Sequence, residues 1–182
     1  YQFRVPTRVI NGVNAVEKTA EEVKGSGGSR VFIVTDKGLV AAGIVGRVTE
    51  ILKKAGLDSV IFDDVEPNPR SKTMQRAAKR YKEEKCNYLL GVGGGSPMDT
   101  VKAVGVLATH EGSVLDYVYG GSKQVVNPLP PNLCIPTTYG TGSEVTMFSV
   151  ITNEETKFKT AIASPLIVPR VAILDPTLCV AL

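Results

Sequence analysis

The sequence predicts an α/β protein built on a parallel sheet with helices on its faces. Three observations support this fold class: short β-branched runs alternate with amphipathic stripes, the alternation occurs three times in a row, and polar or glycine-rich turns follow the runs. Alternation of this kind is typical of parallel sheets with right-handed crossovers. Because ligands of such sheets bind beyond the carboxyl ends of the strands, the turns mark the expected site.

The first strand and helix unit begins at residues 30–35, a β-branched and aromatic run typical of strands that are buried on both faces. The strand ends at Asp36. Apolar residues then recur at spacings of three and four from Leu39 to Ala55, which predicts one amphipathic helix that Gly56 closes.

The pattern then repeats twice. Residues 59–62 predict a second strand, which a rigid proline-containing loop joins to a helix over residues 71–84. Residues 87–92 predict a third strand and residues 97–109 a third helix.

The second half of the chain departs from this alternation. Residues 111–132 are rich in glycine and proline and predict a long surface connection. A short strand at 133–136, a hairpin of 148–152 with 159–163, and a last core strand at 171–174 are expected to follow.

The most informative motif is residues 91–99, Gly-Val-Gly-Gly-Gly-Ser-Pro-Met-Asp, where a buried strand gives way to a helix. Glycines and a helix N-terminus let backbone amides face phosphate oxygens without obstruction by side chains. We interpret the motif as the cradle of a nucleotide pyrophosphate.

Asp36 precedes these glycines and ends a different strand, so the arrangement is not the usual fingerprint in which the acid follows the glycines. An aspartate there can accept both hydroxyl hydrogens of an adenosine ribose and would repel a 2′-phosphate. The alternative is that Asp36 only caps the following turn. A second motif, residues 137–146, combines hydroxyls with two glycines, and it is either a nucleotide contact or a loop that satisfies its own backbone.

The charge pattern argues against a nucleic-acid partner. A net charge of +3 from 21 basic and 18 acidic residues gives no concentrated basic face. The one basic cluster is expected on the solvated side of the helix over 71–84, and it consists of Lys72, Arg76, Lys79, Arg80, Lys82 and Lys85.

Three distant cysteines without CxxC spacing indicate reduced thiols and a cytoplasmic protein. No apolar run reaches the length of about 20 residues that spans a bilayer. The lone His110 has no second metal ligand at i+3 or i+4, which favours a structural role at a helix end.

Five blocks resemble, in their order, the iron-containing (group III) alcohol dehydrogenases. They are Val34-Thr35-Asp36-Lys37, Glu66-Pro67-Asn68-Pro69, residues 93–99 with Lys102, residues 136–146, and Leu174-Asp175-Pro176. The resemblance implies that residues 1–182 form a Rossmann-like N-terminal domain that binds NAD. In full-length members an all-helical domain follows and holds a divalent metal, iron or zinc, through one aspartate and three histidines.

Residue roles also follow from the resemblance. Gly94, Gly95 and Ser96 are expected to hold the pyrophosphate, Asp36 the adenosine ribose, and Asn68 the nucleotide. Asp99 is expected near the nicotinamide and Lys159 near the adjoining ribose. The adenine and phosphate side is expected to be lined by Thr137, Thr138, Thr141 and Thr146.

The parent enzyme would exchange hydride between NAD and a primary alcohol, giving an aldehyde. The chain starts at Tyr1 and ends in an apolar stretch, so we expect an inactive fragment without a metal site. Exposure of Leu178, Val180 and Leu182 is expected to promote homodimers or larger assemblies. The alternatives are a separate nucleotide-binding module and a domain of the glycerol dehydrogenase or 3-dehydroquinate synthase type.

Overall fold

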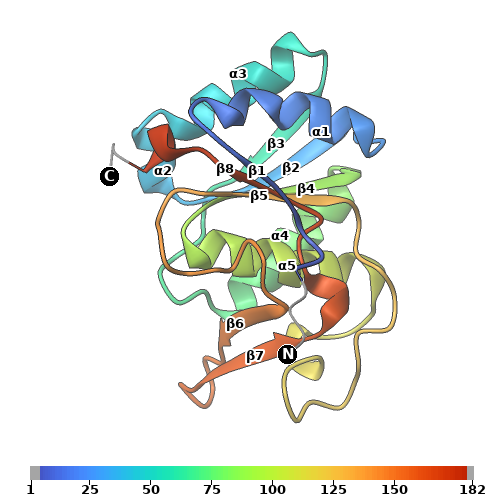
Figure 1. Ribbon diagram of the computed structural model, residues 1–182. Coiled ribbons are helices and arrows are strands. Elements are labelled where there is room, and N and C mark those ends of the chain that lie inside the picture. Colours follow the sequence, from blue (N-terminus) through green and yellow to red (C-terminus); the bar gives the residue numbers. More distant parts are fainter. Residues whose placement is uncertain (1–4, 180–182) are drawn as a thin grey trace.

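A six-stranded, fully parallel sheet forms the centre of the computed structural model, which describes residues 5–179 (Figure 1). Its strands are β1 (Arg8–Asn11), β2 (Arg30–Val34), β3 (Asp58–Phe62), β4 (Tyr88–Gly93), β5 (Asn132–Pro136) and β8 (Val171–Leu174). Their order across the sheet is β1-β8-β5-β4-β2-β3. The crossover after β2 therefore leads to the edge strand β3, and the next one returns past β2 to β4.

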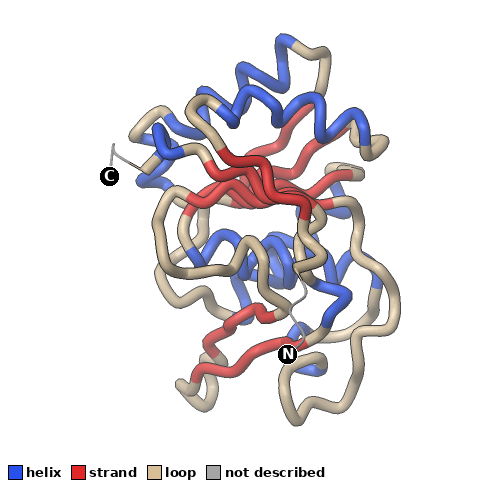
Figure 2. Tube along the Cα trace, in the orientation of Figure 1, coloured by secondary structure: helices blue, strands red, loops and turns tan. Residues whose placement is uncertain are grey.

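Helices cover both faces of the sheet, and a small antiparallel hairpin adds an outer layer (Figure 2). One face carries α1 (Thr19–Gly25), α2 (Lys37–Ala41) and α3 (Ile44–Lys54), and the other carries α4 (Ser71–Glu83) and α5 (Gly95–Thr109). The hairpin of β6 (Phe148–Thr152) and β7 (Lys159–Ala163) lies beyond α5. Short 3₁₀ turns lie at Ala15–Lys18, Val114–Asp116, Pro165–Ile167 and Pro176–Leu178.

Side-chain alternation along β2 shows how the core is divided. Val31 and Ile33 belong to the cluster that includes residues of α1 and α3, whereas Phe32 and Val34 belong to the cluster with α4 and α5. All four side chains are fully buried. The apolar run that predicted this strand is therefore explained by helices on both of its faces.

The predicted alternation is confirmed, with three differences. The helix expected from Leu39 to Ala55 is two helices, because Gly43 adopts a positive φ of 78° that ends α2 and starts α3. Helix α5 begins at Gly95 rather than Pro97, so the glycine motif supplies its first turn. Strand β1 and helix α1 fall in a segment to which the sequence analysis assigned no element.

The expectation that Leu178 is exposed is wrong. Its side chain is 3% exposed and belongs to the cluster with Ala15 and Val16. Asp175 holds this region in place, because its carboxylate accepts hydrogen bonds from the backbone N–H groups of Asn14, Val16 and Thr177. Val180 and Leu182 lie outside the described residues.

His110 has the structural role that the sequence indicated. Its Nε2 accepts from the backbone N–H groups of Val126 and Asn127, each at 3.0 Å, and Nδ1 lies 3.0 Å from the Val106 carbonyl. The basic residues of α4 face solvent, while Met74, Ala77, Ala78 and Tyr81 are buried. Within residues 5–179, no helix has the length and apolar character needed to cross a bilayer.

Two neighbouring glycines test the cause of the break between α2 and α3. Alanine at Gly43 is expected to lower the free energy of unfolding by about 1–2 kcal/mol, because a side chain disfavours left-handed backbone. Alanine at Gly46, which is exposed inside α3, is expected to raise it by about 0.5–1 kcal/mol. Neither added Cβ meets an atom within 4 Å, so urea unfolding of the two variants isolates the backbone effect. Equal changes would contradict this explanation.

Candidate functional site

The turns that follow β2, β3, β4 and β5 line one open crevice of about 570 Å³. This volume lies in the range of pockets that hold cofactors. The turn after β2 contributes Asp36 to Leu39, and the turn after β4 contributes Gly94 to Pro97. The remaining lining residues are Val65, Glu66, Pro67, Thr137 and Thr138.

The crevice lies at the switch point of the sheet. Strands β2 and β4 are neighbours, yet the helices that follow β2 lie on one face and α5, which follows β4, lies on the other. The segments that follow β2 and β4 thus run to opposite faces of the sheet and leave an opening between them. Open α/β sheets bind ligands at such points.

Glycines leave no room for side chains where β4 passes into α5, beside the crevice. A Cβ on Gly93 would lie 2.7 Å from Cγ of Pro97, and one on Gly94 would lie 2.7 Å from Oγ1 of Thr138. Gly94 is the N-cap of α5, and the amides of Gly95 and Ser96 have no backbone partner among residues 5–179. Two free amides at the positive end of a 15-residue helix can bind an anion.

Asp36 both caps a helix and borders the crevice. Its Oδ1 accepts a hydrogen bond from the Leu39 amide at 3.0 Å, so Asp36 does cap α2. Its Oδ2 accepts no hydrogen bond from residues 5–179, and the side chain is partly exposed. One carboxylate oxygen therefore stays available to a ligand, and the ribose role stays a prediction.

A buried network joins α5 to the threonine loop and to the hairpin. The fully buried Lys102 donates from Nζ to Ser143 Oγ at 2.9 Å and to the Phe148 carbonyl at 2.7 Å. The Ser143 hydroxyl donates to Asp99 Oδ1 at 2.7 Å, and Ser149 Oγ donates to the Asp99 carbonyl at 2.7 Å.

The network holds an acid and a base close together in a buried environment. Lys102 Nζ lies 3.8 Å from Asp99 Oδ1. Burial raises the pKa of Asp99, although the Ser143 hydrogen bond and the ammonium of Lys102 favour its ionised form. Burial likewise lowers the pKa of Lys102. The sequence analysis assigned Lys102 no role, although a lysine between Val101 and Ala103 in an apolar helix was a usable signal.

The structure brings together six of the eleven predicted site residues: Asp36, Gly94, Gly95, Ser96, Thr137 and Thr138 line the same crevice. Thr141 lies beside them, since its side chain would be 3.5 Å from a Cβ on Gly95. Residues that sequence reasoning missed are Lys37, Gly38, Leu39, Val65, Glu66, Pro67 and Pro97, most of which flank predicted ones.

The other four predicted residues lie outside this lining. Asp99 points into the network with Ser143, and Thr146 borders a separate hollow beside Phe148. Asn68 and Lys159 both neighbour Thr152, whose Oγ1 donates to the Asn68 carbonyl and which pairs with Lys159 across the hairpin. Their roles stay predictions.

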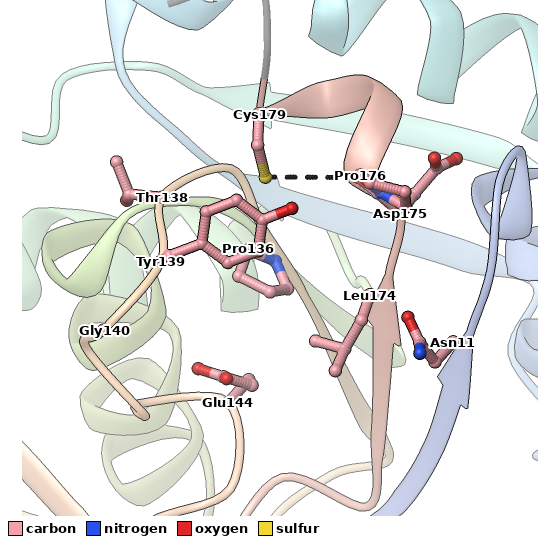
Figure 3. Close-up of a pocket in the computed structure, with 10 residues that line it drawn as sticks. All are labelled: Asn11, Pro136, Thr138, Tyr139, Gly140, Glu144, Leu174, Asp175, Pro176 and Cys179. Carbon is pink, nitrogen blue, oxygen red and sulfur yellow. Dashed lines mark hydrogen bonds between the residues drawn. The ribbon is translucent and has the colours of Figure 1, made fainter.

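A smaller hollow of about 140 Å³ adjoins the crevice and shares Thr138 with it (Figure 3). It lies where β1, β5 and β8 end, and Tyr139 and Cys179 border it on one side. The Cys179 thiol lies 4.0 Å from the Asp175 carbonyl. This hollow is too small for a nucleotide, so the larger crevice is the better candidate for one.

The described residues present no group of three or more His, Cys, Asp or Glu side chains that could hold a metal ion. Cys86, Cys134 and Cys179 are free thiols. Complete burial raises the pKa of Cys134 to about 12. Its thiol is therefore protonated and unreactive at neutral pH.

The chain resembles known proteins in sequence and in fold. Residues 6–176 match the family model "Iron-containing alcohol dehydrogenase". A choline dehydrogenase of Bacillus subtilis is 49% identical over 100% of this chain and 46% of its own length. A crystal structure of 1,3-propanediol oxidoreductase superposes with a TM-score of 0.92 at 40% identity, covering 98% of this chain and 46% of that one.

The NADH-dependent butanol dehydrogenase A of Thermotoga maritima gives the same TM-score of 0.92 at 34% identity, over 98% of this chain and 45% of that one. The chain thus spans less than half the length of the relatives it matches. The family match, by contrast, extends over nearly all of the described residues. The chain belongs to the iron-containing alcohol dehydrogenase family.

Proposed function

We propose that this chain is the N-terminal, NAD-binding part of a metal-dependent alcohol dehydrogenase, whose whole form exchanges hydride between NAD and a primary alcohol. NAD supplies the hydride-accepting ring, and the protein orients it. We further propose that residues 1–182 alone bind the nucleotide without turning over an alcohol.

One observation carries this proposal: Asp36, the free amides of Gly95 and Ser96, and the threonines after β5 border a single crevice at the switch point. An anion-binding helix end and a free carboxylate oxygen are the two features that a pyrophosphate and an adjoining ribose diol require. The name of the NADH-dependent butanol dehydrogenase A of Thermotoga maritima supports the choice of nucleotide.

The residues that the structure describes do not offer a site that fits the metal of the family. A catalytic zinc or iron site needs at least three protein ligands, and residues 5–179 offer no such group. We therefore assign the metal, iron or zinc, to the part of the enzyme that lies outside this chain. Reading the gene beyond Leu182 tests this: a helical region with three histidines supports the enzyme, and an immediate stop codon supports a separate nucleotide-binding module.

Two features support the remaining parts of the proposal. Three free thiols fit a reducing compartment such as the cytoplasm. The hairpin exposes Phe148, Val150 and Phe158 by 47%, 39% and 76%, and apolar patches of this kind favour association of copies.

Replacing Asp36 by Asn is expected to relax the preference for NADH over NADPH. Loss of the charge weakens the ribose hydrogen bonds, which lowers NADH affinity about fivefold, and it removes repulsion of a 2′-phosphate. The ratio of the two dissociation constants should fall at least about tenfold, as measured by titration of reduced-nucleotide fluorescence.

Asparagine caps helices about as well as aspartate, so the free energy of unfolding should change by less than about 0.5 kcal/mol. This stability measurement is the control for the cap that Asp36 provides. Equal affinity of the unsubstituted protein for NADH and NADPH would rule out the ribose role of Asp36.

Replacing Gly95 by Asp is expected to lower NADH affinity more than about tenfold, because a carboxylate would face the pyrophosphate. The fold should tolerate the change, since a Cβ there makes only ordinary contacts with Thr141 and acidic residues favour a helix start. Gly95→Ala is the matched control and should keep NADH affinity within about threefold. Unaltered NADH binding to the aspartate variant would place the pyrophosphate elsewhere.

Association of copies is expected to appear in light scattering as a mass that rises with protein concentration. Phe158→Ser removes the most exposed ring of the hairpin and should shift the rise to higher concentration. A constant monomeric mass of the unsubstituted protein would contradict the expectation.

A further inference from the structure

Charged side chains to which the proposed function assigns no role lie beside the nucleotide crevice. Lys37 lines the crevice next to Asp36, and its Nζ lies 3.3 Å from Oδ1 of Asp64. Oδ2 of Asp64 lies 3.9 Å from Nη1 of Arg76 on α4. One carboxylate outside the lining therefore pairs with two cations, and one of these borders the crevice.

The backbone holds Asp64 in this position. Asp36 and Asp64 form an isolated antiparallel bridge between the turns after β2 and β3. On either side, the Thr35 amide donates to the Phe62 carbonyl at 2.9 Å and the Val65 amide donates to the Thr35 carbonyl at 3.4 Å. The bridge and these two hydrogen bonds place the backbone of Asp64 beside that of Asp36.

A 2′-phosphate on the adenosine ribose would require cations at this position. NADP sites supply them as arginine or lysine near the acid that otherwise binds the ribose. Here Lys37 borders the crevice and Arg76 lies on α4, and both are paired with Asp64.

We propose that Asp64 is a second determinant of cofactor preference, which disfavours NADPH by keeping Lys37 and Arg76 paired. This inference rests on the proposed function, since it presumes that the adenosine ribose lies beside Asp36. Asp36 repels a 2′-phosphate directly. Asp64 acts indirectly, because its ion pairs with Lys37 and Arg76 compete with binding of the phosphate to these cations.

The test replaces Asp64 by Asn and compares it with Asp63→Asn. The control removes the same charge from the adjacent residue, for which the described residues show no ion pair. Asp64→Asn is expected to increase NADPH affinity about two- to fivefold at low salt, the size typical of exposed ion pairs, with NADH affinity unchanged. Asp63→Asn should change neither, and 0.5 M salt should abolish the gain because it screens exposed charges.

Equal gains from both substitutions, or no gain from Asp64→Asn, would overturn the inference. Where NADPH binding to the unsubstituted protein is too weak to measure, the same pair is compared in an Asp36→Asn background, which removes the direct repulsion. NADH binding separates the two levels of proposal: its absence in every variant contradicts the proposed function itself, whereas normal NADH binding with an unchanged NADPH affinity contradicts only the role of Asp64.

Discussion

The crevice depends on the absence of side chains along and just after β4. A Cβ on Gly91 would lie 2.9 Å from Cγ1 of Val101, and one on Gly93 would lie 2.7 Å from Pro97 and 2.9 Å from Leu39. These contacts are shorter than packed atoms tolerate, so any side chain would push α5 or α2 away from the strand. Close packing of α5 on β4 brings the first turn of the helix, with its free amides, to the carboxyl end of this central strand.

The sequence predicted the features that depend on local pattern. An apolar run bounded by a turn identifies a buried strand, and residues 30–35 and 87–92 are such runs because helices cover both of their faces. The parallel topology then implies that the turns after neighbouring strands meet. For this reason Asp36 and the glycine motif could be assigned to one site before any coordinates, whereas Thr137 and Thr138 were assigned to it through the family resemblance.

What the sequence could not predict depends on contacts between distant residues. Strand β1 is mostly exposed and has no apolar run. The burial of Leu178 depends on residues near the opposite end of the chain, and the partners of Lys102 are 41 and 46 residues away. Helix α3 was merged with α2 because a periodic stripe does not reveal the positive φ of Gly43.

The buried network around Lys102 affects how mutagenesis at Asp99 should be interpreted in the proposed whole enzyme. Removing the carboxylate of Asp99 alone would leave an ammonium ion, enclosed by protein, with one counter-charge fewer. Such an uncompensated charge perturbs its surroundings by itself. An inactive alanine variant at this position would therefore not identify Asp99 as a chemical participant, and a joint neutral replacement of both partners would be the informative comparison.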